Sequence, residues 1–460
     1  MANGTSYRRG SVFGALLLIA VGGLFLYANF TPEFNPLPAI ALYWPVLIIF
    51  WGLSKLVDYL MLRGRPEAAA ATRIGAGSIV GLIFLILIGT AFSRAMRGGW
   101  WEGAPIVIGG EEIGCLLGNR YEFTEELIEE DIAAGATLRV RNLRGNLTLT
   151  PGDAGEILLM ARKSVCAASE DQARRVADSY VLVLEGAADG YEIRWDTPSG
   201  TGGFVGAELQ LQVPVAVNLK LSNRRGDIRL SGTRGNVEIN LRRGDVFVEN
   251  VDGDVRVDLS RGDVRIADVT GKVNVEGRGN EVHVRNIGGG ASVEGSFYGP
   301  IRLAAIAGPA RFVSRRTTFE APRIVGSLEF TSGEVILRGV PGDVTLLTRD
   351  KEIEIEGVSG KIRVENRNGR IVLRAPAAPT QPIDIQNRSG DIELVLPTAS
   401  GFEISARVRN GEIESDFAGP GLTLEREERG TQTLRGTYGA RRTSIRLSTS
   451  HGTIYLRRES

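Results

Sequence analysis

The sequence predicts an all-β fold, a single-stranded parallel β-solenoid with coils of about 18 residues, preceded by three transmembrane α-helices. Two observations predict it. Glycines recur every nine residues from Gly226 to Gly271, and each is followed by a short run that alternates apolar and polar residues. Each copy of such a repeat can bury its apolar face only against its neighbours, so a stacked solenoid is the expected product. The second observation is that three apolar segments occupy the first hundred residues, and these segments predict the transmembrane helices.

Residues 1–97 are predicted to form the membrane region. Its first span, residues 11–30, contains no charged residue and is long enough to cross a bilayer. The second span covers about residues 38–62 and the third about residues 74–93. A cleaved signal peptide is the competing interpretation of the first span, because two arginines precede it. The two later spans argue against that interpretation.

The placement of arginines predicts the orientation of these spans. Arg8 and Arg9 precede the first span, and three arginines lie in the loop between the second and third spans. The loop between the first two spans has no Lys or Arg. By the positive-inside tendency the N-terminus is cytoplasmic and everything after the third span is exported, although Arg94 and Arg97 oppose this assignment.

A connector and a cap are predicted between the membrane region and the solenoid. Residues 98–130 contain paired glycines and a cluster of acidic residues, which is typical of a solvated linker. Residues 131–215 are predicted to be a cap of strands with one short helix, which follows the N-cap residue Ser169 and extends to about Asp178. Such an irregular cap protects the open strand edges of a terminal coil.

Residues 216–460 are predicted to form the solenoid itself. The tripeptide Arg-Gly-Asp starts at Arg225, Arg243 and Arg261, eighteen residues apart, so two dissimilar nine-residue halves make one coil. Residues two and four after each glycine, such as Val246 and Val248, share the inward face of a strand. Right-handed coiling is favoured for parallel connections.

The residues between the inward pairs are predicted to point outward and to form two rows, one on each wall of the solenoid. We expect any contact with a ligand to involve these rows, because the inward residues fill the core. One row consists of Arg229, Phe247, Arg265 and His283, and the opposite row consists of Glu238, Arg256 and Asn274.

The aspartates of the tripeptide copies, Asp227, Asp245 and Asp263, are expected to stack along one edge of the coils. Stacked carboxylates can hold calcium, but the calcium-binding nonapeptide repeats of secreted toxins need paired glycines and a second aspartate, which this chain lacks. We expect the neighbouring arginines to pair with these aspartates at exposed corners instead. No metal and no other cofactor is therefore predicted. Integrin binding is disfavoured because the repeat itself accounts for the tripeptide.

The sequence offers little support for catalysis or for nucleic-acid binding. The two histidines, His283 and His451, have no nearby Ser or Cys motif that would make either a general base, so no catalytic residue is predicted. The formal charge is zero, from 54 basic and 54 acidic residues, which argues against a nucleic-acid partner. Cys115 and Cys166 can form at most one bridge, and this count does not exclude an oxidising compartment.

Two segments resemble known families. The segment from Tyr43 to Leu53, in which Trp-Pro is followed by an apolar run and Gly, resembles the transmembrane region of LiaF-like bacterial envelope-stress proteins. The recurrent Gly-Asp-Ile-x-Leu repeats after a strand pair, a helix and Leu-Gln-Val-Pro-Val resemble the bacterial putative-adhesin domain of unknown function, over roughly residues 130–458. That resemblance implies a parallel β-helix that closes on a final Gly-x-Ile, here Gly452 to Ile454, and it brings no catalytic residues.

These observations together predict a non-catalytic protein of the bacterial inner (cytoplasmic) membrane. It crosses the bilayer several times, with its N-terminus in the cytoplasm, and it presents a periplasmic or extracellular β-solenoid for adhesion or scaffolding. The expected partners are the lipid bilayer, an envelope protein or glycan, and a second copy of the chain. An envelope-stress sensor that signals through its membrane helices is the alternative, and a polysaccharide-acting enzyme is the least favoured hypothesis.

Overall fold

The computed structural model describes residues 105–108, 111–115, 119–129, 133–142, 144–153, 155–188, 190–196, 204–427, 430–440 and 443–459, with nine isolated residues between positions 23 and 90. The three predicted membrane spans lie almost entirely outside these residues. Within the described part, no helix is long and apolar enough to cross a membrane. The chain divides into two compact units. The first comprises Met1–Thr124, Arg162–Val181 and Asp196–Gly206, and the second holds the remaining residues.

The first unit contains a hairpin and the predicted soluble helix. Strands β1 (Pro105–Ile108) and β2 (Glu111–Cys115) pair antiparallel. Helix α4 (Glu170–Ser179) confirms the predicted helix, and its N-cap Ser169 accepts the backbone N–H of Gln172 at 3.4 Å. Ala173 and Ala177 of this helix are buried against residues of β6 (Ile157–Ala167) and β3 (Asn119–Glu129).

A buried lysine holds the C-terminal end of helix α4. Lys163 Nζ donates to the carbonyl oxygen of Tyr180 at 2.7 Å and to that of Ala177 at 3.2 Å. The last carbonyl groups of a helix have no partners within the helix and carry partial negative charge. The ammonium group therefore satisfies them in a place where water has little access, since Lys163 is 6% exposed.

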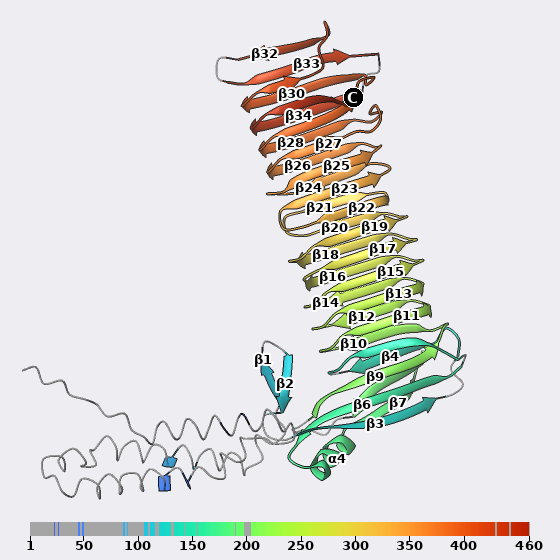
Figure 1. The fold of residues 1–460 in the computed structure, drawn as a ribbon. Coiled ribbons are helices and arrows are strands. Elements are labelled where there is room, and N and C mark those ends of the chain that lie inside the picture. Colours follow the sequence, from blue (N-terminus) through green and yellow to red (C-terminus); the bar gives the residue numbers. More distant parts are fainter. Residues whose placement is uncertain are drawn as a thin grey trace, which may run out of the picture. The chain divides into compact units, whose positions relative to one another are not determined.

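The second unit contains the solenoid, whose strands stack into two facing walls (Figure 1). The first wall belongs to a 17-stranded sheet and the second wall to a 16-stranded sheet. The 17-stranded sheet holds β4 (Thr137–Asn142), β7 (Val181–Ala187), β8 (Gly190–Asp196), β10 (Asn218–Asn223), β12 (Val237–Leu241), β14 (Val255–Leu259), β16 (Val273–Gly279), β18 (Ala291–Phe297), β20 (Ala310–Val313), β21 (Thr318–Ala321), β24 (Val344–Leu347), β26 (Ile362–Asn368), β28 (Ile383–Ser389), β30 (Phe402–Asn410), β32 (Leu422–Arg426), β33 (Gln432–Tyr438) and β34 (Thr443–His451).

The 16-stranded sheet contains the strands of the second wall. Besides β3 and β6 it holds β5 (Leu147–Gly152), β9 (Phe204–Pro214), β11 (Ile228–Arg234), β13 (Val246–Asp252), β15 (Val264–Val269), β17 (Val282–Ile287), β19 (Ile301–Ile306), β22 (Ile324–Phe330), β23 (Glu334–Val340), β25 (Glu352–Val358), β27 (Ile371–Arg374), β29 (Ile392–Pro397), β31 (Ile413–Ser415) and β35 (Ile454–Glu459).

The predicted 18-residue coil is confirmed by the strand register. Val237 pairs with Val255 on the first wall, and Val246 pairs with Val264 on the second wall, each eighteen residues apart in parallel strands. The predicted inward residues are buried; Val246, for example, is fully inaccessible to solvent. Alternation of apolar and polar residues therefore sets the core, because a one-residue slip would turn every buried side chain outward.

The turns between the walls require glycine. Gly244 has a φ of +133°, and a Cβ atom there would lie 2.3 Å from the carbonyl oxygen of Gly226 in the preceding coil. Only glycine combines this backbone conformation with so close an approach of the stacked backbones. The nine-residue glycine repeat is thus a consequence of corner geometry.

The expectation of parallel strands throughout the solenoid is wrong for one coil. Strand β21 pairs antiparallel with both β20 and β24, and β22 pairs antiparallel with both β19 and β23, so this coil runs in the reverse direction. Two hairpin turns cause the reversal, one where Ser314 Oγ accepts the N–H of Thr317 and one where Thr331 Oγ1 accepts the N–H of Glu334. These hydroxyl groups accept hydrogen bonds from backbone N–H groups of the two turns. At the corners between parallel strands, such N–H groups bond to the adjacent coil instead. The core here is aromatic, with the Phe312 and Phe330 rings 4.7 Å apart.

The order of coils in the stack departs from the order in the sequence at both ends of the solenoid. Strand β4 pairs with β8 and β10, and β5 pairs with β9 and β11, so the first coil lies between two later ones. Strand β34 likewise pairs with β28 and β30, and β35 pairs with β29 and β31. The expectation that the Gly452–Ile454 segment closes the stack is therefore wrong: β30 to β33 lie beyond it.

Candidate functional site

The predicted outward row of the second wall exists as a continuous strip. Arg229, Phe247, Arg265 and His283 lie side by side on four successive parallel strands, β11, β13, β15 and β17. The guanidinium carbons of Arg229 and Arg265 lie 4.8 Å and 5.3 Å from the centroid of the Phe247 ring. Cation–π attraction at these distances orders an aromatic ring between two positive charges. We call these four residues the outer row.

The outer row continues to the next strand through His283. The Nε2 atom of His283 lies 2.9 Å from Nη1 of Arg302 on β19 and 3.3 Å from a carboxylate oxygen of Glu281. Arg302 in turn pairs with Glu329 at 2.8 Å. The imidazole ring is therefore held between a cation and an anion, which fixes its position at the end of the row.

The predicted row of the first wall is a network of paired charges. Glu238, Arg256 and Asn274 lie on successive strands in register. Arg256 pairs with Glu276 at 3.0 Å, Asn274 donates to the same carboxylate at 2.8 Å, and Lys220 pairs with Glu238 at 3.5 Å. These contacts use the polar groups within the wall itself, and this row, unlike the outer row, contains no aromatic residue.

The stacked aspartates hold successive coils together. Asp227 Oδ1 accepts the backbone N–H of Asp245 at 3.0 Å, and Asp245 Oδ1 accepts that of Asp263 at 2.9 Å. Asn236 does the same for the N–H of Asp254 at another corner, so the interaction does not require a charge. The described residues contain no group of three or more His, Cys, Asp or Glu side chains that could hold a metal ion.

The expected pairing of these aspartates with the arginines of the tripeptide is also wrong. The carboxylates of Asp227 and Asp263 instead pair with Arg229 and Arg265, at 3.0 Å and 3.5 Å, two residues further along the strand. The alternation of a strand explains this, because residues two apart lie on the same face.

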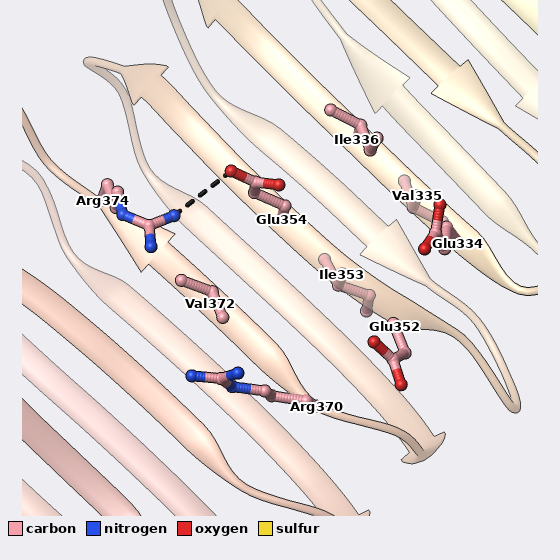
Figure 2. A pocket seen from close by; sticks show the side chains of 9 residues that line it. All are labelled: Glu334, Val335, Ile336, Glu352, Ile353, Glu354, Arg370, Val372 and Arg374. Carbon is pink, nitrogen blue, oxygen red and sulfur yellow. Dashed lines mark hydrogen bonds and ion pairs between the residues drawn. The ribbon is translucent and has the colours of Figure 1, made fainter.

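A hollow of about 260 Å³ lies on the second wall over β23, β25 and β27 (Figure 2). Its rim carries Glu334, Glu352 and Glu354 opposite Arg370 and Arg374, and Arg374 pairs with Glu354 at 3.2 Å. Its floor includes the partly exposed outward residues Ile336 and Val372. Sequence reasoning missed this site, although an apolar residue at an outward repeat position was the signal that could have found it.

A second hollow, of about 370 Å³, lies beside the reversed coil. It combines the exposed ring of Tyr298 with the cations of Arg316 and Lys351. Burial, and after it the positive charge of Arg316, lowers the pKa of the Lys351 ammonium group. Lys351 Nζ donates to the carbonyl oxygens of Thr331 and Ser332. The reversal that creates this hollow was not predicted, so the site was not predicted either.

The comparison with protein families finds a similarity within the solenoid. Residues 205–295 and 325–457 match the family model of Toastrack DUF4097. Both matched segments lie almost entirely in the second unit. The interval between the two matched segments includes β20 and β21, where the coil direction reverses. This similarity supports the expected adhesin-like β-solenoid, and the outer row lies within the first matched segment.

Solved structures similar to the chain have low identity. A putative cell adhesion protein from Clostridium sporogenes ATCC 15579 is 12% identical, with a TM-score of 0.17, and the match covers 74% of this chain and 100% of that chain. A putative adhesin from Bacteroides fragilis NCTC 9343 is 10% identical, with a TM-score of 0.18 and coverage of 73% and 97%. A putative adhesin from Parabacteroides merdae ATCC 43184 is 9% identical, with a TM-score of 0.19 and the same coverage. No curated protein matches the chain.

Proposed function

We propose that this protein is a non-enzymatic, membrane-anchored component of the bacterial envelope. In this proposal its β-solenoid, which is similar to the Toastrack DUF4097 family, lies outside the cytoplasm and presents the second wall to a protein or glycan partner. The observation that carries the proposal is the outer row, in which the Phe247 ring lies beside the guanidinium groups of Arg229 and Arg265. Aromatic residues and arginine are the side chains that most often dominate the binding energy of protein interfaces.

The sheet beneath the outer row favours binding because it is rigid. Each strand that carries a member of the row is hydrogen-bonded to a parallel strand on both sides. Side chains on such a wall lose little conformational freedom when a partner binds, since their backbone is already fixed. The wall therefore supplies a preorganised surface, which suits adhesion or scaffolding.

Export of the domain has two sources of support. The arginine distribution around the three predicted spans favours an exported C-terminal part. In addition, Cys166 is buried and disulfide-bonded. Structural disulfides persist in oxidising compartments and are rare in the cytosol.

The described residues offer no arrangement for nucleophilic catalysis. His283 is engaged by Glu281 and Arg302, and His451 has Asn410 as its side-chain neighbour at 3.3 Å. In this part of the chain neither histidine is hydrogen-bonded to a serine or cysteine side chain that it could activate. These contacts favour a binding surface over an active site.

A crosslinking experiment tests the outer row. We would replace Phe247 in the full chain with a photo-crosslinking phenylalanine analogue, and Asn274 on the opposite wall in a matched variant. Irradiated cells should give a specific adduct from position 247 that disappears when Arg229 and Arg265 are changed to serine. An adduct that contains a second copy of the chain would identify self-association at this row. Equal adducts from both positions, or none from position 247, would contradict the proposal.

Two controls address the remaining parts of the proposal. A reporter fused near residue 132 should be active only outside the cytoplasm, and cytoplasmic activity would contradict export. In the alternative hypothesis of an envelope-stress sensor, the function lies in the membrane helices. Deletion of residues 130–460 separates the two hypotheses, because a remaining effect on the stress response would favour the sensor.

A further inference from the structure

Arginine side chains gather at one corner of the solenoid, where the first wall turns into the second. They line a groove of about 360 Å³. The lining includes Arg144, the adjacent pairs Arg224-Arg225 and Arg242-Arg243, and Arg261, and it contains no acidic residue. We call these six residues the arginine groove. So dense a group of like charges costs free energy unless a counter-charge is bound.

The arginines form files that run along the stack. The carbonyl oxygens of Arg225, Arg243 and Arg261 accept the N–H groups of Gly145, Gly226 and Gly244, each in a neighbouring coil. Arg144, Arg225, Arg243 and Arg261 therefore succeed one another at the strand spacing of about 4.8 Å. Arg224, Arg242 and then Ser260 make a second file beside the first.

The nearest acidic residues in the repeat are occupied elsewhere. The Oδ1 atoms of Asp227, Asp245 and Asp263 accept backbone N–H groups of the next coil, and Arg229 and Arg265 pair with the first and last of these carboxylates. Among the described side chains, no carboxylate lies within 4.0 Å of Arg224, Arg242, Arg243 or Arg261. The positive charges of these four arginines are thus available to an external anion.

We infer that the arginine groove binds a linear anionic polysaccharide laid along the stack axis. Planar guanidinium groups match carboxylate and phosphate groups through paired hydrogen bonds. The regular spacing over successive coils fits a polymer with a repeated charge, whereas a single small anion would need groups that converge on one point. The groove lining contains no aromatic residue on which bases could stack, which disfavours single-stranded nucleic acid.

This inference concerns a different surface from the outer row. It depends on the proposed function only for the location of the domain outside the cytoplasm, where envelope polysaccharides occur. Changes in the arginine groove leave Arg229, Phe247 and Arg265 intact, so the two proposals can fail separately.

The chain offers a matched pair of variants for the test. Ser260 occupies the position of Arg224 and Arg242 in the next coil, which shows that serine fits this corner. The test variant is therefore R224S/R242S. The control is R367S/R388S, which removes the same charge from two exposed arginines on the adjacent parallel strands β26 and β28.

Binding of the full-length protein would be measured with polygalacturonate, phosphomannan, neutral dextran and single-stranded DNA as probes. We expect one or both anionic polymers to bind in preference to dextran, and the two polymers distinguish carboxylate from phosphate recognition. Affinity should fall about tenfold in R224S/R242S, as expected for the loss of two charged contacts, and should weaken with added salt. The control variant should retain its affinity.

Three outcomes would overturn the inference. These are an equal loss of affinity in the control variant, tighter binding of single-stranded DNA than of either anionic polymer, and no preference for anionic polymers over dextran. Thermal unfolding of both variants would show that they remain folded. If the crosslinking at position 247 persists while polymer binding is absent, the inference about the groove fails and the proposed function stands.

Discussion

Asp245 Oδ1 accepts the backbone N–H of Asp263 from the next coil at 2.9 Å. Asn146 Oδ1 makes the equivalent contact with the N–H of Asp227, also at 2.9 Å. We therefore expect Asp245→Asn to keep most of the stability of the domain. Asp245→Ala should lower the free energy of unfolding by about 1–2 kcal/mol, because it leaves a partly buried donor unsatisfied.

Urea unfolding of the two variants beside the wild type provides the measurement. Addition of calcium should leave the unfolding midpoint of the wild type unchanged. A loss of stability in Asp245→Asn as large as that in Asp245→Ala would show that the negative charge itself is needed, and would return the calcium hypothesis to consideration.

Gly244→Ala should destabilise the solenoid strongly. Its Cβ atom would lie 2.3 Å from the carbonyl oxygen of Gly226, and its φ of +133° is a conformation that alanine rarely adopts. We expect a loss of about 2–4 kcal/mol, since backbone strain and a backbone clash act together. Gly333→Ala is the matched control, because a Cβ there would meet no atom within 4 Å. A similar unfolding midpoint for both variants would contradict the explanation of the glycine repeat.

The repeating coil could be predicted from the sequence because two local requirements coincide at each repeat. Corners require glycine, as at Gly244, and strands require alternation, as at Val246 and Val248. The same uniformity explains why the order of coils could not be predicted. Every coil presents a similar apolar and hydrogen-bonding pattern, so the pattern does not specify that β34 lies between β28 and β30.

The candidate sites could be predicted in part for a similar reason. Alternation placed Arg229 and Phe247 on the outer face correctly, because the direction of a side chain follows from its position in the strand. The arginine groove was missed because Arg243 was expected to pair with Asp245, which lies two residues later in the sequence. The carboxylate instead accepts a backbone N–H of another coil, which no local pattern shows.

The position of the last coil predicts unusual protection of the chain end. Strands at a terminus usually fray and exchange their amide hydrogens readily. Strand β35, however, pairs with β29 on one side and with β31 on the other. The amides of Ile454 and Leu456 should therefore exchange as slowly as those of Val246 and Val248, whereas the amides of β32, which pairs with β33, should exchange faster. Hydrogen exchange read by mass spectrometry checks this order, and rapid exchange in β35 would contradict the intercalated position.

Ala305 marks a position where glycine should be better than alanine. Its φ is +51°, and the equivalent residues of preceding coils are Gly232, Asn250, Asp268 and Asn286, all with positive φ. Alanine in the left-handed region costs about 1–2 kcal/mol, while glycine adds freedom to the unfolded chain that offsets part of the gain. Ala305→Gly should therefore raise the free energy of unfolding by about 0.5 kcal/mol. Ala304→Gly, one residue earlier in the regular part of β19, should lower it by about 0.5–1 kcal/mol. Parallel unfolding curves decide the matter, and a loss of stability in both variants would refute the strain assigned to Ala305.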